Sequence, residues 1–180
     1  MKAVVNFTVD DLLNNYLFVA SKSKAAVSKR RKVRLVMVTG CFIAAGGSFI
    51  AQDMYMMWGF VIAALFFLLV YPWVQGLIYK RNYRKHAEER YIGIKDVVFN
   101  YEITDDSIST QSSVGDVIIK ASQIELIIET QEYFFVRLSS QDTITLPKRY
   151  FDFNVLYAQL TKISAANRVS IHKDLDWKWR

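Results

Sequence analysis

The 180-residue chain has few residues that crosslink small domains or bind transition metals, since it contains one cysteine and two histidines. It also has only two prolines. A single cysteine, Cys41, cannot form an intramolecular disulfide, so a disulfide-rich secreted module is excluded. The two histidines, His86 and His172, lie far apart in sequence and leave little material for a metal site or a His-based catalytic group. We therefore expect no metal and no cofactor.

Sequence motifs typical of phosphate binding or catalysis are also absent. The sequence has no Gly-rich phosphate loop, no nucleophile elbow and no Ser/His/Asp order. Asp105-Asp106 could form a carboxylate pair, but between two predicted strands it indicates a turn. Glu125, Glu129 and Glu132 could attract a cation, yet they alternate with apolar residues and indicate a solvated face. We expect a protein that is not an enzyme and has no catalytic residue.

The net charge of +6 is unevenly distributed. Residues 22–90 hold twelve Lys or Arg and three acids, whereas residues 91–180 hold ten Lys or Arg and twelve acids. A nucleic-acid module would place its positive charge on a folded face with aromatic residues among it. Here the basic excess borders apolar runs, so we expect no nucleic acid as partner.

Two long apolar runs follow the first basic cluster. They cover residues 35–51 and 57–78, and neither contains a charged side chain. As helices they would reach about 26 and 33 Å, against about 30 Å for the hydrocarbon core of a bilayer. A domain of this size cannot easily bury two helices that are apolar all round. The sequence therefore predicts two membrane spans, at about residues 34–51 and 57–78.

The flanks of the two runs predict the orientation of the hairpin. The connection at residues 52–56 has one acid, Asp53, and no Lys or Arg. Because cytoplasmic loops carry the excess of positive residues, both termini should be cytoplasmic. The orienting residues are Lys29, Arg30, Arg31, Lys32, Arg34, Lys80, Arg81, Arg84 and Lys85.

Small residues at four-residue spacing predict where the two spans pack against each other. Such residues let helix backbones approach closely in lipid. Pro72, near the end of the second run, predicts either a kink or the cytoplasmic end of that span. The predicted packing residues are Gly40, Ala44, Ser48, Gly59 and Ala63.

The remaining sequence predicts cytoplasmic structure. Residues 1–28 indicate a short strand at 4–7 and an amphipathic helix, with Thr8 and Asp11 forming a capping-type start. This helix could lie on the membrane or pack on the C-terminal domain. Residues 29–90 form the hairpin with its basic flanks, and residues 91–166 alternate like consecutive strands before a closing helix. Residues 167–180 form a tail.

The strands of residues 91–166 predict one antiparallel sheet. We expect them at 97–103, 108–111, 117–120, 124–129, 133–138 and 143–146, followed by a helix at 152–164. The predicted fold class is thus an α+β membrane protein: a two-helix transmembrane hairpin with a cytoplasmic antiparallel-sheet domain that a C-terminal helix closes.

With its basic-flanked hairpin and the stretches "ITDDSISTQSS" and "IIKASQIELIIETQEYFFVRLSSQDTITLPKRYF", the chain resembles the YcxB-like family of bacterial membrane proteins. The stretch Leu146–Phe151 carries the resemblance most clearly, whereas Ala121 stands where family members often have tryptophan. The resemblance implies a fold similar to small pleckstrin-homology (PH) domains, a location in the bacterial cytoplasmic (inner) membrane, and no established enzymatic activity.

Three functions remain open. We expect that the PH-like domain binds a protein partner beside the membrane, with the loop Pro147, Lys148 and Arg149 as the candidate interaction surface. An immunity protein against a pore-forming or membrane-active toxin is an alternative, based on size, two spans and the lack of an enzyme site. Lipid-headgroup binding is the other alternative, which the acidic Asp105-Asp106 turn disfavours. Membrane lipids are expected contacts in each case, and a homo-oligomer is compatible with all three.

The C-terminal tail carries Trp177 and Trp179 beside Lys178 and Arg180. Such an aromatic and basic end could rest at the lipid interface. It could equally form an extra strand or stay disordered.

Overall fold

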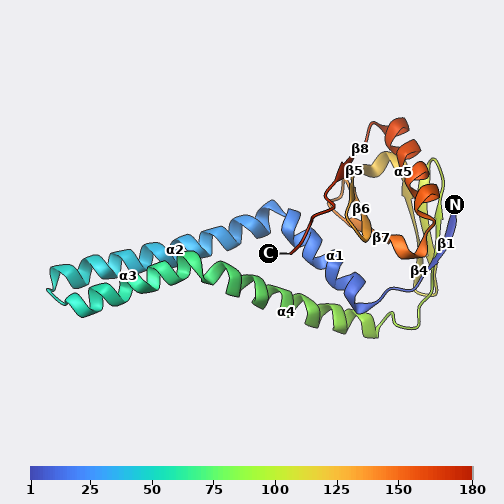
Figure 1. The fold of residues 1–180 in the computed structure, drawn as a ribbon. Coiled ribbons are helices and arrows are strands. Elements are labelled where there is room, and N and C mark those ends of the chain that lie inside the picture. The colour runs from blue at the N-terminus through green and yellow to red at the C-terminus, as the bar shows by residue number, and fades with distance from the viewer. Residues whose placement is uncertain (180) are drawn as a thin grey trace. The chain divides into compact units, whose positions relative to one another are not determined.

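The computed structural model describes residues 1–179, and within this range the chain is an α+β protein with five α-helices and two four-stranded sheets (Figure 1). The chain divides into two compact units. We call Met1–Tyr16 with Arg84–Lys178 the sheet unit, and Leu17–Tyr83 with Trp179 the helical unit.

The first sheet has the strand order β1-β2-β3-β4 and is antiparallel throughout. The helical segment is inserted between its first two strands, so residues 1–5 and 99–103 pair although they are far apart in sequence. The strands are β1 (Lys2–Val5), β2 (Phe99–Ile103), β3 (Ser107–Ser112) and β4 (Gly115–Lys120).

The second sheet has the order β7-β6-β5-β8, and β8 lies parallel to β5. Its strands are β5 (Ile124–Glu129), β6 (Tyr133–Leu138), β7 (Thr143–Pro147) and β8 (Ser170–Lys173). The predicted bounds of β5 and β6 are confirmed, but the prediction of one antiparallel sheet is wrong. Strand β8 was not predicted because its four residues do not alternate between apolar and polar side chains. With β1 and β8, the sheet unit extends beyond residues 91–166.

Helix α5 (Phe153–Asn167) supplies a buried apolar stripe to the core of the sheet unit. The side chain of Asp152 caps the helix by accepting a hydrogen bond from the Val155 N–H at 3.1 Å. The stripe recurs at three- and four-residue spacing, as the sequence predicts. The fully buried core includes Ile103, Ile108, Ile127, Phe134, Val136, Leu146, Leu156, Leu160 and Ile163.

Four helices lie between β1 and β2: α1 (Val9–Lys22), α2 (Lys24–Ile50), α3 (Met54–Leu69) and α4 (Tyr71–Ile92). Helices α2 and α3 run side by side in opposite directions (Figure 1). Residues 51–53 connect them, with Gln52 in the left-handed region at φ 60°. The Asp53 side chain then accepts from the Met56 N–H at 3.0 Å and starts α3.

The second apolar run is not one straight helix. It breaks at Val70, where α3 and α4 meet at a bend of 53°. Pro72 explains the break, because its ring has no N–H for the carbonyl of Leu68 and clashes with that carbonyl in a continuous helix. The kink predicted at Pro72 is therefore present.

The contact between α2 and α3 also differs from the prediction. Their buried residues are Ala45 and Ala64. A Cβ added to Gly40 or Gly59 would meet no atom within 4 Å, so these glycines lie outside the close contact. Ala44, Ser48 and Ala63 are half-buried. Small residues do lie where α2 and α3 touch, but the buried ones are not those predicted from the four-residue spacing.

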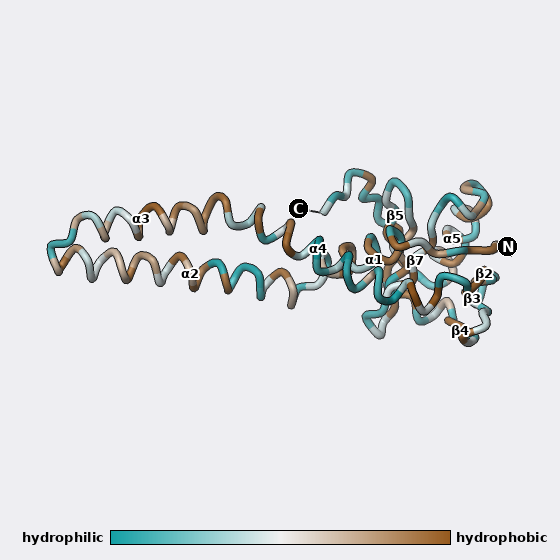
Figure 2. Tube along the Cα trace, turned by 90° about the horizontal axis from the view of Figure 1, so that it is seen from below, coloured by the Kyte–Doolittle hydropathy of each residue, from teal (hydrophilic) through white to brown (hydrophobic). Residues whose placement is uncertain are grey.

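Helix α2 is the one helix among residues 1–179 that is by itself long and apolar enough to cross a membrane. Helices α3 and α4 reach that length and hydropathy only together. Figure 2 shows hydrophobic residues along α2 and α3 and hydrophilic residues in the N-terminal part of α2. Only 6% of the apolar window of α2 is buried, which distinguishes it from the core helix of a soluble protein.

Candidate functional site

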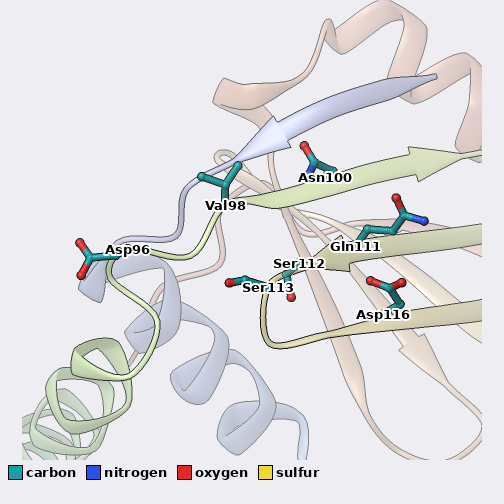
Figure 3. A pocket seen from close by; sticks show the side chains of 7 residues that line it. All are labelled: Asp96, Val98, Asn100, Gln111, Ser112, Ser113 and Asp116. Atoms are coloured by element: carbon teal, nitrogen blue, oxygen red, sulfur yellow. The ribbon is translucent and has the colours of Figure 1, made fainter.

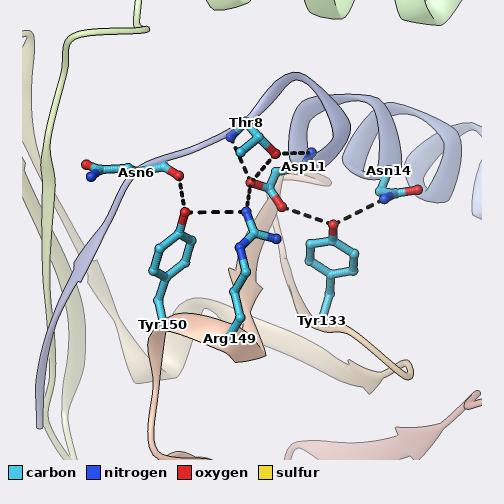
Figure 4. A network of polar contacts seen from close by, with 7 residues as sticks. All are labelled: Asn6, Thr8, Asp11, Asn14, Tyr133, Arg149 and Tyr150. Atoms are coloured by element: carbon cyan, nitrogen blue, oxygen red, sulfur yellow. Dashed lines mark hydrogen bonds and ion pairs between the residues drawn. The ribbon is translucent and has the colours of Figure 1, made fainter.

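The carboxylate of Asp11 lies in the sheet unit and has no exposed surface. Oδ2 accepts from the Thr8 N–H at 2.8 Å, from the Thr8 hydroxyl at 2.9 Å and from the guanidinium of Arg149. Oδ1 accepts from the Tyr133 hydroxyl at 3.0 Å (Figure 4). We call Thr8, Asp11, Asn14, Tyr133, Arg149 and Tyr150 the Asp11 cluster.

The Asp11 cluster joins elements that are distant in sequence. Thr8 and Asp11 form the predicted capping start of α1, and the Asp11 N–H in turn donates to the Thr8 hydroxyl at 3.3 Å. Tyr133 opens β6, Arg149 follows β7, and the Tyr150 hydroxyl donates to the main-chain carbonyl of Asn6. The hydrogen bonds of Asp11 to Tyr133 and Arg149 therefore hold the start of α1 against the second sheet. Of the two alternatives for the N-terminal helix, packing on the C-terminal domain holds for its first turns.

The surroundings of the cluster set its charge state. Burial alone would raise the pKa of Asp11, but hydrogen bonds from Arg149, Thr8 and Tyr133 outweigh it and hold that pKa below 3.8. Burial, with the nearby negative charge of Asp11, raises the pKa of Tyr133 to about 12. The hydrogen bond to Asp11 raises the pKa of Arg149. Asp11 and Arg149 are thus an ion pair at neutral pH. A carboxylate with four donors and no access to solvent anchors a helix; it is not placed to exchange a proton with a substrate.

A second ion pair lies beside this cluster. Lys148 Nζ donates to Glu129 Oε1 at 2.8 Å, and both side chains are largely buried. The ammonium also lies 4.7 Å from the ring centre of Phe134 and 5.0 Å from that of Phe153. Glu129 was expected on a solvated face, and this expectation is wrong. Strand β5 is covered on both faces over Ile127–Glu129, and a lysine from η2 (Lys148–Tyr150) compensates the buried charge.

These two pairs change the interpretation of the loop Pro147, Lys148 and Arg149. Pro147 is buried, and both cations are held by carboxylates of the same unit. A phosphate or an acidic peptide would have to displace Glu129 or Asp11 to bind there. The loop is therefore structural rather than an open anion-binding surface.

The other predicted acidic residues are part of turns and surface pairs. Asp105-Asp106 connects β2 to β3, and Asp105 accepts a hydrogen bond from Gln159 of α5 at 2.6 Å. Because β1 lies at the N-terminus, this acidic turn follows the second strand of the chain. Glu125 pairs with Arg137 at 3.0 Å. Residues 1–179 contain no group of three His, Cys, Asp or Glu side chains that could hold a metal ion.

An open polar hollow of about 460 Å³ lies on the outer face of the first sheet (Figure 3). The register places Asn100, Gln111 and Asp116 side by side across β2, β3 and β4. Val98, Ser112, Ser113 and Asp96 complete the lining. Two carboxylates without a basic lining residue disfavour an anionic ligand in this hollow.

Exposed apolar side chains lie on the outer strand of the first sheet. Strand β4 ends the sheet, and no strand among residues 1–179 pairs with its outer side. Val117 and Ile118 are exposed in this strand, and the exposed Val114 precedes them in the turn. Ile118 is 72% exposed. A short apolar edge with unpaired main-chain groups can accept a further strand.

The predicted basic flanks lie on α2 and α4. Arg30 is engaged, since its guanidinium lies 5.8 Å from the ring centre of Tyr79 and 5.0 Å from that of Trp179. Arg84 and Lys85 pair with Glu88 and Glu89 one turn later. Arg34 is half-buried. The remaining exposed flank residues are Lys29, Arg31, Lys32, Lys80 and Arg81.

The C-terminal tail also lies against the chain itself. Trp177 packs edge-on against Phe135 in the sheet unit, with ring centres 6.4 Å apart. In the helical unit, the indole N–H of Trp179 donates to the Gly76 carbonyl at 2.9 Å, and its ring contacts Tyr83. Strand β8 (Ser170–Lys173) forms within the predicted tail and ends before the two tryptophans. Both indole rings are half-buried against other residues of the chain.

Comparison with known proteins identifies part of the sheet unit. The family model described as YcxB-like protein matches residues 103–158, which run from the end of β2 into α5. Neither the curated proteins nor the solved structures contain a match to this chain. The matched residues include β5, β6, β7 and the turn that carries Lys148 and Arg149. The resemblance expected from the sequence is thus confirmed over this stretch: residues 103–158 are a YcxB-like region.

Proposed function

We propose that the chain is an integral protein of the bacterial inner membrane that crosses the bilayer twice, with both termini in the cytoplasm. Helix α2 forms the first span, and α3 with the start of α4 forms the second. The proposal is supported by the large apolar side chains that α2 and α3 leave uncovered, because water would be a poor solvent for them and lipid a good one.

The lengths of α2 and α3 support a cytoplasmic membrane boundary at the same level in both spans. Counting equal numbers of residues from the connection at 51–53, Arg34 of α2 is level with Val70, where the second run bends. Sixteen helical residues span about 24 Å, slightly less than the hydrocarbon core. The aromatic residues Tyr71 and Trp73 follow the bend at once, where interfacial aromatic residues are expected.

Reporter fusions test this topology. A fluorescent protein fused to the C-terminus should fluoresce, and a phosphatase that is active only outside the cytoplasm should be active when inserted at Gln52. The reverse pattern would contradict the orientation. Activity of the phosphatase at both sites would contradict the second span and leave α2 alone in the membrane.

We further propose that the sheet unit is a non-enzymatic, PH-like domain that binds a protein partner next to the membrane. The strand order supports the PH-like assignment, since four antiparallel strands, three more and a closing helix follow one another, with β8 added. The partner function rests on one observation: the apolar outer edge of β4, in a unit whose prominent buried charges are paired within the chain.

Lipid-headgroup recognition has less support. The basic residues next to the sheets that could hold a phosphate, Lys148 and Arg149, are paired with Glu129 and Asp11. The polar hollow of the first sheet contains Asp96 and Asp116, which would repel a phosphate. Anionic lipid can still interact with the exposed basic flanks at about 1 kcal/mol per residue, which orients the protein without recognising a particular lipid.

Site-specific photo-crosslinking in living bacteria tests the partner function. A crosslinker placed at Val114, Val117 or Ile118 should give protein adducts, whereas one at Val155, an exposed valine of α5, should give none. Mass spectrometry identifies the adducts, and a toxin as partner would indicate the immunity function. If the inserted, folded protein gives no protein adduct at any β4 position, the proposal fails. Turnover of a substrate that one polar substitution abolishes would also refute it.

A further inference from the structure

We infer that the partner of the β4 edge is β4 of a second copy of this chain, paired antiparallel about Ile118. This inference rests on the proposed function of the β4 edge as a docking surface and names its occupant. Two identical strands that pair antiparallel are related by a two-fold axis, so one position of the strand lies opposite itself.

The register about Ile118 makes the edge complementary in charge. It places Asp116 of one copy opposite Lys120 of the other, and the two-fold axis repeats this pair. Opposite charges directly across a strand pair are stabilising, and like charges are destabilising. Moving the centre to Val117 or Ile119 places a charged residue opposite Ile118 instead. Among the registers centred on these three residues, only the one about Ile118 matches both charges.

The same register is complementary in hydrophobicity. Pairing with β3 places Ile119 beside the buried Ile108 and Val117 beside Thr110, so both face the core side of the sheet. In the paired copies Val117 lies opposite Ile119, which extends the apolar face of each core across the edge. On the outer face, the exposed Ile118 side chains of the two copies lie opposite each other.

The other outer strands of the described sheets lack this pattern. Strand β7 contains Pro147, which has no N–H to donate to a new neighbour. Strands β1 and β8 each carry lysine without an acid in the strand. Natural edges are commonly protected by a charged side chain near their middle. In β4 the charges lie near the two ends of the strand, and the middle is apolar.

Disulfide trapping tests the register in the full-length protein, in membranes and with Cys41→Ser as background. Residues directly opposite have Cβ atoms about 4.5–5.5 Å apart, close to disulfide geometry. Ile118→Cys should therefore crosslink to itself. The Asp116 positions of the two copies lie about 13 Å apart along the strands. Asp116→Cys should thus crosslink with Lys120→Cys on a second copy, but not with itself, and Val155→Cys should give no crosslink.

Charge exchange tests the complementarity without cysteine. Asp116→Lys alone creates two Lys–Lys contacts and should weaken association about tenfold, measured by energy transfer between labelled copies as they are diluted in lipid. The double variant Asp116→Lys with Lys120→Asp restores opposite pairs and should restore association. Near-ultraviolet circular dichroism should be unchanged in both, because the two side chains are exposed.

The outcomes separate this inference from the function on which it rests. Self-crosslinking at Ile118 and rescue by the double variant support a second copy. No self-crosslink, together with adducts of another protein at Ile118, overturns the inference and leaves the proposed partner function standing. Absence of any protein adduct at β4 overturns both. Association that Asp116→Lys leaves unchanged overturns the register.

Discussion

The two units of this molecule use apolar residues in opposite ways. In the sheet unit the large side chains Phe134, Leu146 and Leu156 have no exposed surface, and Asp11 and Glu129 are buried with cationic partners. In the helical unit α2 and α3 bury chiefly alanine and expose their large side chains. The units therefore differ in burial as well as in hydropathy. The comparison is what the proposed topology requires: the sheet unit excludes water from a core, whereas the proposal places the large side chains of α2 and α3 in lipid.

The strongest way to sharpen this comparison is the same substitution in each unit. Phe134→Ala should destabilise the sheet unit by about 3–5 kcal/mol, because it empties a close-packed core and removes a ring next to Lys148. Phe42→Ala, at a side chain 57% exposed on α2, should leave stability nearly unchanged if lipid chains replace the lost contacts. Unfolding of both variants in lipid nanodiscs, followed by near-ultraviolet circular dichroism, measures the difference. Equal losses would contradict the comparison.

A charge on the outer surface of α2 tests whether that surface faces lipid. Ile43 is 71% exposed and lies near the middle of the apolar run. Ile43→Asp should raise the free energy of insertion by about 2.5–3.5 kcal/mol and reduce the membrane-inserted fraction. Tyr55→Asp is the control, because Tyr55 begins the second helix next to the connection and should tolerate charge. Insertion is measured by extraction of membranes with alkaline carbonate. An unchanged inserted fraction for Ile43→Asp would indicate that water covers α2.

The sequence predicted those parts of the fold that follow from local periodicity. The strands at Ile124–Glu129 and Tyr133–Leu138 have the predicted bounds, and the stripe of α5 is buried as expected. The capping pair of Thr8 and Asp11 forms as well. Each of these depends on residues within one or two turns of one another, so their pattern is visible without tertiary structure.

The candidate site was less predictable because its partners are distant in sequence. The number of residues between Asp11 and Arg149 carries no information about their contact, and Glu129 alternates with apolar residues as a solvated side chain would. The pairing of β1 with β2 across the helical segment is equally non-local. One signal was available: Lys148 and Arg149 follow a buried strand and precede a helix, where free cations are less expected than paired ones.

Removing Arg149 should break the attachment of α1. Arg149→Met leaves the buried Asp11 carboxylate without its cation and should lower the stability of the sheet unit by about 2–3 kcal/mol, a range that allows for the 45% exposure of the Arg149 side chain. Hydrogen exchange should increase most in the first turns of α1, because they lose their contact with the second sheet. Lys162→Met, at an exposed lysine of α5, is the control and should change stability by less than about 0.5 kcal/mol.

The same pair predicts how the sheet unit responds to acid. The folded pKa of Asp11 lies below its ordinary value, so its ion pair stabilises the fold above pH 4 and this contribution is lost as pH falls through the folded pKa. Stability should therefore be level near neutral pH and fall below pH 4. Asp11→Asn should be less stable at pH 7 and show a smaller fall. Unfolding midpoints between pH 2.5 and pH 7 measure both; parallel curves would exclude Asp11 as the group responsible.

The smallest effect compares two helix caps of the same type. Asp152 caps α5 in the sheet unit, and Asp53 caps α3 at the connection of the two apolar helices. Asp152→Ala should cost about 1 kcal/mol, because the first N–H groups of α5 lose an acceptor that is linked to a packed helix. Asp53→Ala should lower the free energy of unfolding by a similar amount only if water cannot reach the N-terminus of α3. We expect a smaller loss there, since the connection is exposed and water can replace the carboxylate. A loss at Asp53 that equals or exceeds the loss at Asp152 would place this connection within the apolar layer and move the proposed cytoplasmic boundary away from Arg34, toward the connection.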